Sequence, residues 1–104
     1  MQRSFPRQAL RGDIEFGTPP SVKVNGVAAQ LAPGVRIRGL NNMLVMSGAL
    51  VGEKVTVNYT IDTYSLVKDV WLLRQDEIDN LWPKTTKEAA TWSFDEIGQT
   101  WTKP

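Results

Sequence analysis

The chain has 104 residues, with 12 basic and 11 acidic side chains, and it contains neither cysteine nor histidine. A chain of this length forms one domain with a modest core, and its 41% of hydrophobic residues is ordinary for a folded protein. The missing residue types exclude disulfides, thiolate chemistry, and imidazole groups that could act in catalysis or bind a metal.

The charge is uneven along the chain, although the net charge is only +1. Residues 1–52 carry six basic and two acidic side chains, whereas residues 53–104 carry six basic and nine acidic ones. A basic first half can serve an anionic partner, but a mixed, solvated surface is the simpler interpretation.

No segment of the sequence is suited to crossing a membrane. The best apolar run, residues 43–51, has nine residues against the roughly 20 that a spanning helix needs. The first six residues contain no apolar stretch and no cleavage site, so no export signal is expected in this sequence.

The first half of the chain predicts short strands separated by turns. Strands are expected at residues 9–16, Ser21–Val24 and 27–30, the last two joined by Asn25-Gly26, the best two-residue hairpin turn. Pro33-Gly34 predicts a further turn before a strand at residues 35–38. A strand at 43–46 follows the turn 39–42, and residues 47–52 form either a loop or one helical turn.

The longest hairpin is predicted from Lys54–Ile61 and residues 66–73, both of which alternate between apolar and polar side chains. Short, closely spaced strands of this kind are typical of sandwiches and closed barrels, and at this length a barrel hides its edges better. The fold class is therefore mainly β, a small antiparallel barrel, OB-like or SH3-like, of five or six strands.

The C-terminal quarter predicts one or two short helices. A helix is expected at residues 75–82, and a second at Thr86–Thr91, where Thr85 serves as the N-cap and Glu88 completes a capping box. Residues 92–102 can form a hairpin with its turn at 95–98. Residues 1–104 are expected to form a single domain, with the barrel at 9–74 and the tryptophan-rich segment 75–104 packed on it.

No catalytic arrangement, cofactor site or metal site is expected. Asp13 and Glu15 are two apart on one strand and fit a solvated face. Asp76, Glu77 and Asp79 occupy the first turn of a predicted helix, where the helix dipole favours acids, and their spacing lacks the calcium-loop pattern. The protein is accordingly expected not to be an enzyme.

One candidate binding face follows from strand parity. If Val35 and Ile37 point inward, Arg36 and Arg38 point outward, and the long strand adds an outward row of Lys54, Thr56, Asn58 and Thr60. Trp71 is a single outward aromatic ring that the C-terminal segment can cover, and Tyr59 belongs to the core. The candidate ligand-binding residues are Arg36, Arg38, Lys54, Asn58 and Trp71, with single-stranded nucleic acid as the possible ligand.

A protein partner is the alternative to nucleic acid. Four tryptophans are many for 104 residues, and three of them lie in the last quarter of the chain. Tryptophan is enriched in protein interfaces, although these rings can equally pack the C-terminal segment onto the barrel.

The residues 36–45 (RIRGLNNMLV), 57–62 with 69–71 (VNYTID and DVW), and 92–95 with 99–104 (WSFD and QTWTKP) resemble small exported proteins of β-proteobacteria without an assigned biochemical function. The resemblance implies a periplasmic or envelope location, with the cytoplasm as the alternative. Residues 50–57 (LVGEKVTV) are similar to a strand entry of OB-like barrels. We therefore expect a non-enzymatic binding or structural domain, monomeric, with an unknown protein partner.

Overall fold

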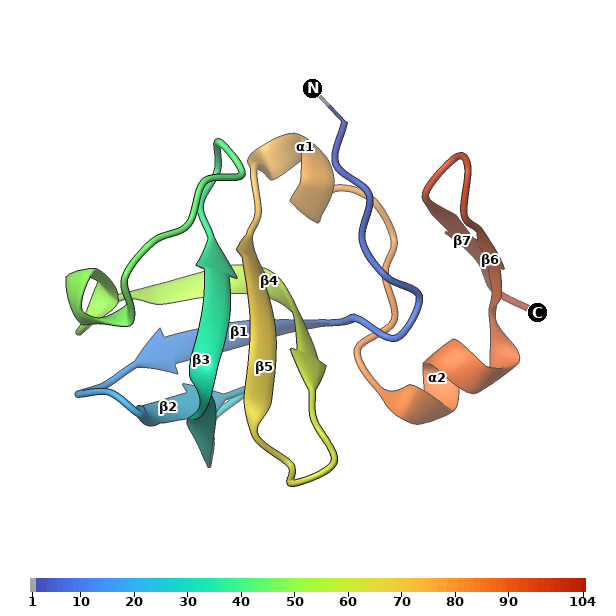
Figure 1. Cartoon of the computed structure of the whole chain (residues 1–104). Helices are drawn as coiled ribbons and strands as arrows, with labels where there is room; N and C mark the ends of the chain where they lie inside the picture. Colours follow the sequence, from blue (N-terminus) through green and yellow to red (C-terminus); the bar gives the residue numbers. More distant parts are fainter. Residues whose placement is uncertain (1) are drawn as a thin grey trace.

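A computed structural model describes residues 2–104 and contains a closed barrel, a separate two-stranded sheet and three short helices (Figure 1). The barrel strands are β1 (Leu10–Phe16), β2 (Ser21–Val24), β3 (Val27–Arg38), β4 (Lys54–Ile61) and β5 (Val67–Leu72). The other elements are η1 (Ser47–Leu50), α1 (Gln75–Ile78), α2 (Thr86–Thr91), β6 (Ser93–Asp95) and β7 (Thr100–Thr102). The prediction of a mainly β fold with a small barrel is confirmed.

The barrel closes in the order β1-β2-β3-β5-β4, with β4 pairing back onto β1. Four of the five pairings are antiparallel, and the β3–β5 pairing is parallel. Closure gives each strand a hydrogen-bonded neighbour on both sides, and it removes the edges that two small sheets would expose.

The Asn25-Gly26 turn is confirmed. Both residues have positive φ angles, 52° and 83°, which is the backbone that this two-residue hairpin requires. The Asn25 side chain also accepts a hydrogen bond from the backbone N–H of Asp13 at 2.9 Å, so the turn is fastened to β1.

The predicted turn at Pro33-Gly34 is wrong, because β3 continues through both residues. The pairing with β5 shifts between Leu31, opposite Val67, and Arg36, opposite Asp69. Gly34 has a φ of 75°, and proline lacks the donor that a regular ladder needs. The same residue types that favour a turn therefore produce a bulge inside a long strand.

Two other predicted elements are shorter in the structure. The expected strand at 43–46 is reduced to a single bridge between Arg38 and Leu44. The expected helix at 75–82 ends at Ile78, where the Arg11 guanidinium donates hydrogen bonds to the carbonyl groups of Glu77, Ile78 and Asn80. The α2 helix has its predicted bounds, and the Thr85 hydroxyl accepts a hydrogen bond from the Glu88 N–H.

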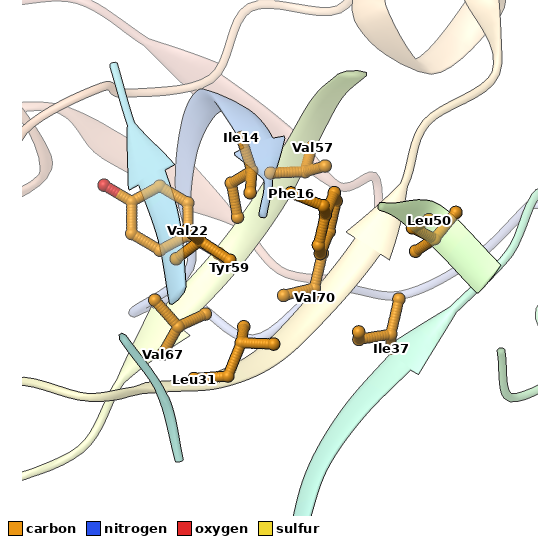
Figure 2. Packing of buried hydrophobic residues seen from close by; sticks show 10 residues of the cluster. All are labelled: Ile14, Phe16, Val22, Leu31, Ile37, Leu50, Val57, Tyr59, Val67 and Val70. Atoms are coloured by element: carbon orange, nitrogen blue, oxygen red, sulfur yellow. The ribbon is translucent and has the colours of Figure 1, made fainter. Parts of the chain in front are cut away.

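The barrel interior is filled by inward-facing side chains from all five strands, and Leu50 of η1 packs into the same cluster (Figure 2). Tyr59 belongs to it, as its parity predicted. Full burial of one such aliphatic or aromatic side chain contributes about 1.5–3 kcal/mol. The buried members are Ile14, Phe16, Val22, Leu31, Ile37, Leu50, Val57, Tyr59, Val67 and Val70.

A second apolar core lies outside the barrel and is built largely from the two ends of the chain. Its buried members are Phe5, Ala9, Trp71, Leu73, Trp82 and Trp101. The Phe5 ring meets Trp71 at 5.7 Å and Trp82 at 5.6 Å, both edge to face, and Trp82 meets Trp101 in the same way. The N-terminal segment and the C-terminal elements thus lie together on one side of the barrel (Figure 1).

Replacing Trp82 by alanine should lower the free energy of unfolding by about 3–5 kcal/mol, because Trp82 is buried and its indole N–H donates to the Ala9 carbonyl at 2.8 Å. Urea denaturation followed by far-ultraviolet circular dichroism measures the change. The matched control is Trp92→Ala, which removes a half-buried indole and should cost less than about 2 kcal/mol. Equal losses for the two variants would contradict a central role for Trp82.

Candidate binding surfaces

The predicted basic face is only partly assembled. Strand register places Asn58, Trp71 and Arg38 side by side across β4, β5 and β3, and it places Arg36 opposite Asp69. Lys54 lies at the start of β4, opposite Glu15 of β1. It is therefore four residues from Asn58, about 13 Å along the strand, and does not join the other four residues.

Asn58 does not present its side chain to a ligand. Asn58 is on the outer face of β4, but it is fully buried, and Thr60 of the same row is also buried. Trp71 is 8% exposed because Phe5 of the N-terminal segment packs against it within the second core. The only exposed candidates are Arg36 and Lys54, and the aromatic ring that a nucleic-acid base would stack on is covered.

Arg38 is engaged within the protein. Its Nη1 atom lies 3.8 Å from Asp69 Oδ1, and its guanidinium lies 5.4 Å from the centre of the Trp71 ring. An arginine over an indole gains a cation–π attraction on top of the ion pair. These contacts give Arg38 a structural role in holding β3 and β5 together.

Arg36 faces a small hollow at the bulge of β3. The hollow has a volume of about 360 Å³ and is lined by Gly34, Arg36, Lys68 and Asp69. The Asp69 carboxylate accepts a hydrogen bond from the Thr60 hydroxyl at 3.0 Å. No aromatic side chain lines this hollow, so it offers charge to an anion and no platform for a base.

A buried ion pair that the sequence did not predict joins Arg3 to Glu77. Arg3 donates to both carboxylate oxygens, at 2.6 and 2.9 Å, and also to the carbonyls of Gly39 and Leu72. Burial by itself would raise the pKa of Glu77, but hydrogen bonds from Arg3 and from the Arg74 N–H, with both arginine charges, hold that pKa below its ordinary value. The carboxylate therefore stays ionised.

A second buried arginine, Arg11, closes the end of α1. It donates to Asn58 Oδ1 at 2.8 Å and to the carbonyls of Glu77, Ile78 and Asn80. Burial lowers the pKa of the Arg11 guanidinium, and the charge of Glu77 opposes this effect. No local signal pairs Arg11 with residues 66 to 69 positions away, which is why sequence reasoning missed the cluster.

A cleft of about 540 Å³ runs beside this cluster, between the N-terminal segment, α1 and the β6–β7 turn. Arg3, Arg11 and Glu77 line it, together with Asn80 and Gln99. Nearly all N–H groups of Arg3 and Arg11 already donate to protein acceptors, so the two cations have little left to offer a ligand. The cluster of Arg3, Arg11 and Glu77 therefore has a structural role.

The most distinctive exposed surface is the apolar loop, defined here as residues 39–52 between β3 and β4. The sequence has no charged residue in this interval. Five of its large apolar side chains are at least half exposed, among them Leu44 at 68% and Met46 at 80%. The full set is Leu40, Met43, Leu44, Met46 and Val51.

The apolar loop is ordered by a backbone hydrogen bond within the loop, by another to β3, and by two inward side chains. The Gly39 N–H donates to the Met43 carbonyl, and the Val45 N–H donates to the Ile37 carbonyl, both at 2.8 Å. Leu50 is buried in the barrel core, and Val45 packs against it. The exposed side chains are thus presented from a defined backbone.

The chain matches no family model, no curated protein and no solved structure. Within residues 2–104, no helix is long and apolar enough to cross a membrane. Over the same residues, no three acidic side chains gather where they could hold a metal ion. The candidate surfaces therefore have to be judged on their own chemistry.

Replacing Glu77 by glutamine should destabilise the fold by about 3 kcal/mol at pH 7, because Arg3 would keep a buried charge without its counter-charge. Since the folded-state pKa of Glu77 is lowered, its contribution is present above the unfolded value of about 4.3 and is lost as the pH falls through the folded pKa. The difference between wild type and variant in urea denaturation should therefore shrink in acid.

The matched control is Glu96→Gln, at an exposed position in the β6–β7 turn, which should change stability by less than about 0.5 kcal/mol at either pH. A difference between wild type and Glu77→Gln that stays constant from pH 7 to pH 3 would show that the Glu77 charge does not contribute.

Proposed function

We propose that this protein is a non-enzymatic binding or structural barrel of the bacterial cell envelope, and that it contacts a protein partner through the apolar loop. The observation that carries the proposal is the set of exposed apolar side chains, Leu40, Met43, Leu44 and Met46, in an interval without charge. Large apolar side chains that are exposed together on a folded domain are typical of an interaction site.

The composition of the apolar loop supports a protein partner. Interface cores are depleted in charged residues and enriched in methionine, whose flexible thioether adapts to a partner's shape. The bond from Gly39 to Met43 and the bond from Val45 to Ile37 of β3 reduce the ordering that binding would require. Nucleic acid, by contrast, is held by cations, and the loop has none.

The envelope location rests on the resemblance of residues 36–45 and of the C-terminal residues to small exported proteins. The OB-like kind of barrel is also a proposal, and five strands closing in a non-sequential order support it. Neither resemblance carries a partner with it, because one fold serves many functions. A monomer is the oligomeric state that we propose.

A photo-crosslinking amino acid at position 46 should capture one discrete protein in cells that naturally produce this chain, because Met46 is 80% exposed in the apolar loop. The same amino acid at Tyr64, which is 83% exposed in the β4–β5 turn, is the control and should capture nothing discrete. The captured protein is then identified by mass spectrometry and purified.

Binding of that purified protein should be lost in Met43→Ser/Leu44→Ser and retained in Arg36→Ala/Arg38→Ala. It should also change little with salt, because no charge of the loop contributes. A partner that binds the serine variant as well as the wild type would show that the apolar loop is not the contact surface.

An amide-shift NMR titration with a mixed single-stranded oligonucleotide tests nucleic-acid binding directly. We expect no shifts at low salt or at about 150 mM salt, because Trp71 and Asn58 are covered and Arg38 is paired with Asp69. Salt-sensitive shifts clustered on residues 35–38 and 54–60 would instead establish binding through Arg36, Arg38 and Lys54.

A further inference from the structure

The apolar loop contains a strand edge on the outside of the closed barrel. Residues 43–45 run antiparallel to the end of β3, with the Gly39 N–H bonded to the Met43 carbonyl and the Val45 N–H bonded to the Ile37 carbonyl. In such a pairing, alternate residues direct their backbone groups toward the partner strand and away from it. Met43 and Val45 face β3, so Leu44 between them faces outward.

The outward backbone groups are unpaired. Among residues 2–104, the Leu44 N–H, the Leu44 carbonyl and the Met46 N–H have no hydrogen-bond partner. Leu44 and Met46 are also strongly exposed, so these groups are accessible to a partner. In Figure 1 the segment descends from the turn above β3 to η1, and no labelled strand lies along its outer side.

Apart from its shortness, this edge lacks the features with which proteins normally protect a strand edge. Such edges usually carry a lysine, an inward charge, a proline or a bulge, each of which discourages another strand from pairing. Residues 43–46 contain none of these, and the nearest charges in the sequence are Arg38 and Glu53. The edge is short, uncharged and apolar, and these properties favour pairing with another strand over exposure to solvent.

We infer that the protein binds an extended, uncharged, apolar peptide segment, which adds a β-strand to residues 43–46. The inference rests on the proposed function and specifies how the same surface recognises its partner. Backbone bonds to Leu44 and Met46 fix the register of the incoming strand, and contacts with Met43, Leu44 and Met46 select apolar side chains.

The surroundings of the edge favour a peptide over a second copy of the chain. The edge spans about 13 Å and is bounded by the turn at residues 39–42 and by η1. In a symmetric antiparallel pair, η1 of one copy would lie beside the turn of the other, so these elements would also have to fit together. An extended peptide has to fit only the edge itself.

The experiment selects peptides from a phage-displayed library of random 12-residue sequences on the full-length protein, and the best binder is then synthesised. N-methylation of each peptide bond in turn removes one donor at a time and leaves the protein unchanged. Strand addition predicts that affinity falls at least about tenfold at alternate peptide positions and little at the positions between them.

Two protein variants complete the test. Leu44→Pro removes the outward N–H but keeps the Gly39–Met43 bond and the bond from Val45 to Ile37 of β3, and it should weaken binding at least about tenfold. Leu44→Ala keeps the N–H and should weaken binding only a few-fold. Amide protection of Gly39 and Val45 in the proline variant verifies that the loop backbone is intact.

Three results would overturn the inference. In the first, the loss of affinity on N-methylation does not alternate along the peptide, or it follows the spacing of a helix. In the second, the library yields no peptide whose binding depends on Leu44. The third is a concentration-dependent dimer that Leu44→Pro dissolves, which would assign the edge to a second copy. If Met46 still cross-links a protein that requires Met43 and Leu44, only the strand pairing fails, and the proposed function stands.

Discussion

The buried carboxylate of Glu77 is the point on which the parts outside the barrel depend. It binds Arg3 through both oxygens and accepts the N–H of Arg74, while Arg3 reaches on to the carbonyls of Gly39 and Leu72. One ion pair therefore ties the N-terminal segment to α1, to the end of β5 and to the first residue of the apolar loop. Buried charges are costly unless they are paired and hydrogen-bonded, and here both conditions hold.

The second core determines which surface of the barrel remains available. By covering Trp71, the two ends of the chain convert the best candidate for base stacking into an internal packing surface, while Arg11 donates to the buried Asn58. The barrel interior is filled by its own side chains as well. What remains distinctive is the apolar loop, which exposes five large apolar side chains in an interval without a charged residue.

Local patterns predicted local structure well. Alternation placed Tyr59 in the core, Asn25-Gly26 predicted its turn, and Thr85 predicted the start of α2, because each signal acts within a few residues. Parity also placed Asn58 on the outer face of β4, but it could not show what covers that face. The partners of Arg3 and Asn58 come from segments 74 and 47 residues away, and no spacing rule connects them.

The joining of both chain ends in one core has a consequence for biosynthesis. All five barrel strands lie within Leu10–Leu72, so the barrel can assemble once its own strands have emerged from the ribosome. Phe5 is made early, yet Trp82, which packs on it, and Trp101, which packs on Trp82, are made late. The second core is therefore completed only after the C-terminal elements have been made, and until then Phe5 can pack on Trp71 without the tryptophans that join both rings in the finished protein.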